Sequence, residues 1–210
     1  MGLDWNPGNK PKPGHEAEFT KLFHQLDEVS VDAERDALFQ EFMRVSITAF
    51  ETLQAPRVGE SAEADAWARE MYRKKAREGT EEEWLQKLRG FYVLALVPEC
   101  DGLPRYSNGD PGGYVEPYSF RAKFLEDCEE IVGAEMLERA YQPMLSTEFL
   151  AYGEELRERV EGFAARHSID MENLDINDFD GIDFKVDVVR SASRWCRFWA
   201  ERGHILDPYF

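Results

Sequence analysis

Apolar side chains recur at helical spacing along most of the chain, and these stripes predict its secondary structure. The clearest stripe contains Phe149, Gly153, Leu156, Val160, Phe163 and His167. Residues three and four positions apart lie on one face of an α-helix, so this pattern predicts an amphipathic helix. A second stripe contains Val188, Ala192, Trp195 and Trp199. It predicts the last helix, with Asp183 as N-terminal cap and Gly203 as its stop.

The same spacing predicts three helices in the first part of the chain. One spans about residues 15–29, one begins at Ser30 and carries its stripe to Leu53, and one spans about residues 61–78. The stretch between the second and third helices contains a proline and a glycine, which interrupt helical structure.

A T-x-x-E capping box, formed by Thr80 and Glu83, marks the start of a further helix. The apolar phase of this helix continues through residues 91–97. Periodicity does not separate a buried helix end from a short buried strand there, and we favour helix because the phase is continuous.

Two shorter helical patterns lie in the middle of the chain. One begins at Ser119 and is broken or kinked at Gly133, and the next spans residues 134–142 and ends at Pro143. Residues 168–183 have no helical pattern and are acidic, so we expect an irregular connection before the last helix.

Together the patterns predict an all-α fold, with seven or eight helices packed as an irregular bundle in a single domain over residues 15–210. Residues 1–14 contain three prolines and three glycines, which predicts an irregular segment. We expect this segment to dock through Trp5, and the apolar tail 204–210 to pack on the body.

The formal net charge of −17, from 42 acidic and 25 basic residues, disfavours nucleic-acid binding and favours a basic protein partner. Acidic charge also keeps proteins soluble without any partner. No apolar run is long enough to span a bilayer, and the N-terminus lacks the apolar region of a secretory signal. We therefore expect a cytoplasmic protein without membrane contact.

The sequence contains no phosphate-binding loop, nucleophile elbow or zinc-ligand spacing, so we expect no cofactor and no metal, and leave open whether it is an enzyme. The acidic stretch 175–187 fails the EF-hand pattern in either register, although an irregular low-affinity calcium site stays open. Cys128 and Cys196 lie on apolar stripes and are expected in the core, whereas Cys100 lies in a loop and is the candidate reactive thiol.

The Pro/Gly/Tyr-rich loop 102–120 is the candidate site. Prolines restrict its backbone, and its tyrosines offer flat surface that loses little entropy on binding. The candidate ligand- or partner-binding residues are Arg105, Tyr106, Asn108, Asp110, Tyr114, Tyr118 and Arg121. The alternative is a structural cover, with the tyrosines buried over apolar surface.

Three functional hypotheses follow from these features. The first is a non-catalytic protein of immunity or inhibitor type that binds a basic protein surface. The second is an enzyme or small-ligand binder with a pocket under residues 99–121. The third is a homo-oligomer that associates through its aromatic surface.

Overall fold

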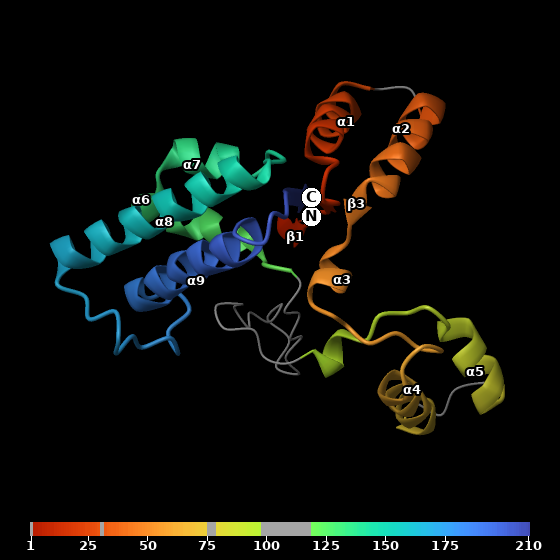
Figure 1. The fold of residues 1–210 in the computed structure, drawn as a ribbon. Helices are drawn as coiled ribbons and strands as arrows, with labels where there is room; N and C mark the ends of the chain where they lie inside the picture. Colours follow the sequence, from red (N-terminus) through yellow and green to blue (C-terminus); the bar gives the residue numbers. More distant parts are fainter. Residues whose placement is uncertain (1, 30–31, 75–78, 98–118) are drawn as a thin grey trace. The chain divides into compact units, whose positions relative to one another are not determined.

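The computed structural model describes residues 2–29, 32–74, 79–97 and 119–210 (Figure 1). It is 61% helical and 9% strand, which confirms a mainly-α fold. The chain divides into two compact units, one formed by residues 1–49 with 100–210 and the other by residues 50–99. The single domain and the bundle packing expected from the sequence stay predictions.

The helices α8 (Ser146–His167) and α9 (Ile182–Ala200) pack side by side in the first unit (Figure 1). Their two stripes are buried as predicted, apart from His167, which is exposed and stacks on Phe163. A Cβ added at Gly153 would lie 2.7 Å from the Cβ of Cys196, so the glycine permits the close approach of the two helices. Ser193 Oγ joins them by donating a 2.8 Å hydrogen bond to the carbonyl oxygen of Gly153.

The N-terminal segment is held by the core of this unit. Strand β1 (Asp4–Pro7) pairs antiparallel with β4 (Leu206–Tyr209), and the backbone of Trp5 also pairs with that of Phe120. Trp5 is fully buried, and its ring stacks 6.0 Å from that of Trp195. The predictions that this segment docks through Trp5 and that the C-terminal tail packs are therefore confirmed. The sequence did not predict that the two segments pair as β-strands.

Helices α1 (Glu16–Glu28) and α2 (Asp32–Arg44) pack on each other through the rings of Phe19 and Phe42, whose centroids are 4.6 Å apart. The prediction that the second helix runs to Leu53 is wrong. It ends at Arg44, and a two-residue strand, β3 (Ser46–Ile47), pairs with β2 (Lys10–Pro11) before the short helix α3 (Ala49–Thr52). The backbone N–H and C=O groups of this stretch form hydrogen bonds with a segment distant in sequence, so they do not form the bonds that would continue the helix.

The second unit contains α4 (Ala62–Lys74) and α5 (Glu81–Leu88), which pack around Val58, Ala64, Ala68 and Val93. The predicted capping box is confirmed. The backbone N–H of Glu83 donates to Thr80 Oγ1 at 3.2 Å, and the N–H of Thr80 donates to Glu83 Oε2 at 2.9 Å.

The preference for helix over residues 91–97 is wrong. Helix α5 ends at Leu88, Gly90 adopts a φ of +85°, and Phe91 is 52% exposed. Residues 94–96 form one 3₁₀ turn, η1 (Leu94–Leu96). The glycine takes a left-handed conformation that ends the helix, so the continuous apolar phase does not correspond to a continuous helix.

The chain after the central loop begins as a 3₁₀ helix, η2 (Ala122–Cys128), and continues as α6 (Glu129–Val132). Phe120 therefore precedes the helix that was predicted to carry it. The predicted break at Gly133 is confirmed by its φ of +77°, and α7 (Ala134–Arg139) ends ahead of Pro143.

The connection between α8 and α9 is irregular, as predicted, but Asp183 does not cap α9. Gly181 occupies the N-cap position of that helix, and the carboxylate of Asp183 instead accepts a 3.0 Å hydrogen bond from the N–H of Asp175. Asp183 therefore orders the connection rather than the helix end.

Candidate functional site

Six of the seven residues predicted to form a site lie outside the described residues: Arg105, Tyr106, Asn108, Asp110, Tyr114 and Tyr118. The seventh, Arg121, lies next to the Trp5–Phe120 backbone pair. Its Nε is 3.8 Å from the Asp4 carboxylate, an ion pair that links the middle of the chain to the N-terminal segment. The loop-site hypothesis stays a prediction.

A different surface combines exposed apolar side chains with acidic ones that form no ion pair within the described ranges of the chain. We call residues 170–184 the acidic aromatic segment, because they contain six acidic residues and no basic residue. Phe179 is 74% exposed, Ile176 50% and Ile182 37%. Large apolar side chains gathered within seven residues of one exposed connection are typical of a surface that becomes buried on binding.

The carboxylates of this segment bond to its own backbone. Asp170 accepts from the N–H of Glu172, Asp175 from the N–H of Asn177, and Asp178 from the N–H of Asp180. Hydrogen bonds from the Asn173 side chain and the Glu172 backbone hold the pKa of Asp170 below its usual range, and those from Asn177 lower the pKa of Asp175. Asp170 and Asp175 are therefore held ionised and ordered at neutral pH.

Within the described residues, none of the five aspartates of this segment forms an ion pair. Lys185, which follows it, pairs with Glu130 at 2.8 Å. The same residues contain no group of three or more acidic, histidine or cysteine side chains that could hold a metal ion. The segment offers negative charge without the ligand set of a metal site.

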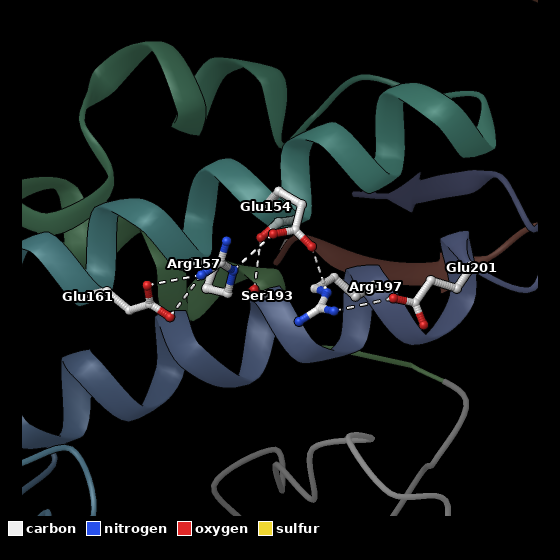
Figure 2. A network of polar contacts seen from close by, with 7 residues as sticks. Glu154, Arg157, Glu161, Ser193, Arg197 and Glu201 are labelled. Carbon is white, nitrogen blue, oxygen red and sulfur yellow. Dashed lines mark hydrogen bonds and ion pairs between the residues drawn. The ribbon is translucent and has the colours of Figure 1, made fainter.

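A second feature is an ion-pair network between α8 and α9. In Figure 2, Glu154 projects from α8 toward two guanidinium groups. Its carboxylate lies 2.9 Å from Arg157 Nε and 2.7 Å from Arg197 Nε. Arg157 also pairs with Glu161, and Arg197 with Glu201 (Figure 2).

One end of this network borders a cavity of about 270 Å³. Four arginines line it, together with Val160, Glu161, Met171, Glu172 and Ser193. The arginines are Arg157, Arg190, Arg194 and Arg197. Sequence reasoning did not identify this cavity, although the three arginines of α9 recur at spacings of four and three residues, which places them on one helix face.

The buried titratable groups of the first unit are parts of its core. Burial raises the pKa of the Cys128 thiol to about 12 and that of Cys196 well above its usual value, so both are poor nucleophiles. Their predicted core positions are confirmed by exposures of 1% and 0%. Cys100, the candidate reactive thiol, lies outside the described residues.

No protein-family model, curated protein or solved structure matches this chain. None of the helices in the described ranges combines the length and the apolar character that crossing a bilayer requires.

Proposed function

We propose that this protein is a non-catalytic binding protein, and that the acidic aromatic segment binds a basic, amphipathic surface of a protein partner. The observation that carries the proposal is the exposure of Phe179, Ile176 and Ile182 among ionised aspartates without ion-pair partners in the described chain. Such a surface suits a partner that presents lysine or arginine beside apolar side chains.

The two kinds of side chain have separate roles in this proposal. The aspartates attract a basic partner from a distance and select against acidic ones, because opposite charge steers encounter. Phe179 supplies the contact that holds the partner, since an aromatic side chain that becomes buried contributes more than a rim charge. The rings of Phe179 and Phe184 already pack in a T-shaped arrangement with their centroids 5.2 Å apart, which limits the conformational freedom lost on binding.

Titration of the whole chain with a synthetic helical peptide of lysine and leucine tests this proposal, with a glutamate–leucine peptide as the opposite-charge control. We expect saturable binding of the basic peptide alone. The Phe179→Ala variant should weaken it about tenfold to a hundredfold, the effect of losing one buried aromatic contact. Phe39→Ala, which removes a 49% exposed phenylalanine from α2, is the matched control and should bind normally.

Charge variants and a salt series distinguish the contribution of these aspartates to binding from that of the overall negative charge. The Asp178→Asn/Asp180→Asn variant should weaken binding more than Glu34→Gln/Glu41→Gln, which removes the same charge from exposed positions on α2. The difference in affinity between these two variants should disappear as the salt concentration rises from about 0.1 M to about 1 M, because the Debye length falls from about 10 Å to about 3 Å. Equal losses in the two variants, or equal binding of both peptides, would contradict the proposal.

A further inference from the structure

The arginine-lined cavity between α8, α9 and the start of the acidic aromatic segment has more hydrogen-bond donors than acceptors. Arg157 and Arg197 are held by the glutamates of the network. Arg190 pairs with Asp187 at 3.0 Å and donates to the carbonyl oxygen of Met171. The Nε of Arg190 is shielded from solvent and has no hydrogen-bond partner among the described residues.

Arg194 has no ion pair or hydrogen bond with any residue that the structure describes, and its side chain is exposed at the cavity. This is notable because the chain has 42 acidic residues against 25 basic ones, and the neighbouring arginines of the same helix face are all paired. A guanidinium group presents five N–H donors and no acceptor, so the donors of Arg194 that face solvent are available to an acceptor that displaces water.

We propose that this cavity binds a small molecule through an oxyanion group, a phosphate or a carboxylate, with Arg194 as the principal binding residue. Guanidinium groups bind the planar edges of both oxyanions through paired N–H donors. The volume of about 270 Å³ is just below the range of drug-sized sites, which fits a small metabolite-like anion. Val160 and Met171 provide an apolar wall for its carbon skeleton.

Two glutamates on the wall limit what the cavity accepts. Glu161 is neutralised by Arg157, but Glu172 has no ion-pair partner in the described part of the chain. Its charge opposes a highly anionic ligand and places the oxyanion on the arginine side. Met171 and Glu172 also belong to the acidic aromatic segment, but this inference rests on the arginines, whereas the basic-partner proposal rests on Phe179 and the aspartates.

Calorimetric titration with inorganic phosphate and with citrate, at constant ionic strength set by chloride, tests the inference. We expect saturable binding of at least one of the two, and binding of only one identifies the oxyanion class. Arg194→Gln should weaken binding about tenfold, because it removes a charged hydrogen-bond donor. Arg166→Gln is the matched control, since Arg166 is an exposed α8 arginine without a described partner and lies outside this cavity.

A second variant should act in the opposite direction. Glu172→Gln removes the opposing charge and should strengthen binding several-fold, whereas Glu135→Gln, an exposed acid on α7, should not. Absence of saturable binding by both probes would overturn the inference. Equal weakening of binding in the Arg194 and Arg166 variants would also overturn it, because any exposed arginine would then bind the probe anion equally well.

Discussion

The indole nitrogen of Trp5 donates a 2.8 Å hydrogen bond to the backbone carbonyl oxygen of Ala140, 135 residues further along the chain. The same ring contacts Phe120, Tyr152 and Trp195 in the centre of the first unit. A segment that the composition describes as irregular is therefore part of the core.

Two substitutions of Trp5 separate the contribution of its apolar contacts to stability from that of its hydrogen bond. Trp5→Ala should lower the free energy of unfolding by about 3–5 kcal/mol, as for other buried aromatic truncations. Trp5→Phe retains most of the apolar contact but leaves the Ala140 carbonyl without its donor, at a cost of about 1–3 kcal/mol. Urea denaturation followed by far-UV circular dichroism measures both. A loss below about 0.5 kcal/mol for the alanine variant would show that the segment is not part of the core.

Gly153 should not tolerate alanine, although alanine is the better helix former by about 1 kcal/mol. The added Cβ would lie 2.7 Å from the Cβ of Cys196, and overpacking of this kind costs about 1–3 kcal/mol. The clash outweighs the propensity, so Gly153→Ala should lower the melting temperature. Gly162→Ala on the same helix is the control, because its Cβ would meet only Arg166 Nη1, at 3.5 Å. That variant should be neutral or stabilising.

The capping box of α5 gives a local prediction for the second unit. Thr80→Ala removes the acceptor of the Glu83 N–H and should cost about 1 kcal/mol of helix stability, whereas Thr80→Ser should retain the cap. Hydrogen exchange at the backbone amides of Glu83 and Trp84 reports this directly. Protection unchanged in the alanine variant would show that the cap contributes nothing to the helix.

His204 links the stability of the first unit to pH. It is fully buried, and its Nδ1–H donates to the carbonyl oxygen of Gly8 at 2.7 Å, while its ring and that of Trp199 pack in a T-shaped arrangement. Burial lowers the pKa of His204 to about 4, from about 6.5 in the unfolded chain. The fold therefore favours the neutral ring. Its contribution is fully present above the unfolded pKa and is lost as the pH falls from about 6.5 toward about 4.

We expect the free energy of unfolding to fall by about 1 kcal/mol per pH unit between about pH 6 and about pH 5. His204→Gln should abolish this part of the slope, even if it lowers stability at every pH. His24→Gln, which changes an exposed ring on α1, is the control and should retain the slope. Chemical denaturation at several pH values decides, and parallel curves for all three proteins would contradict the assignment.

The sequence by itself determined the elements whose signal is local. The stripes of α8 and α9, the capping box at Thr80 and the break at Gly133 are correct, because each depends on residues within a few turns of one another. These features are properties of a short segment, so here they could be read without knowing what the segment packs against, whereas the cap assigned to Asp183 and the helix assigned to residues 91–97 could not.

Only the tertiary structure decided where the chain leaves that local pattern. The pairing of β1 with β4 joins opposite ends of the chain, and the strand at Ser46 ends a helix whose apolar phase continues. Likewise, the sequence shows the arginines of α9, but not that Arg190 and Arg197 are paired while Arg194 has no ion pair with any residue in the described ranges. Backbone pairing and charge neutralisation depend on partners far away in sequence, and the three-dimensional packing alone brings those partners within hydrogen-bond distance.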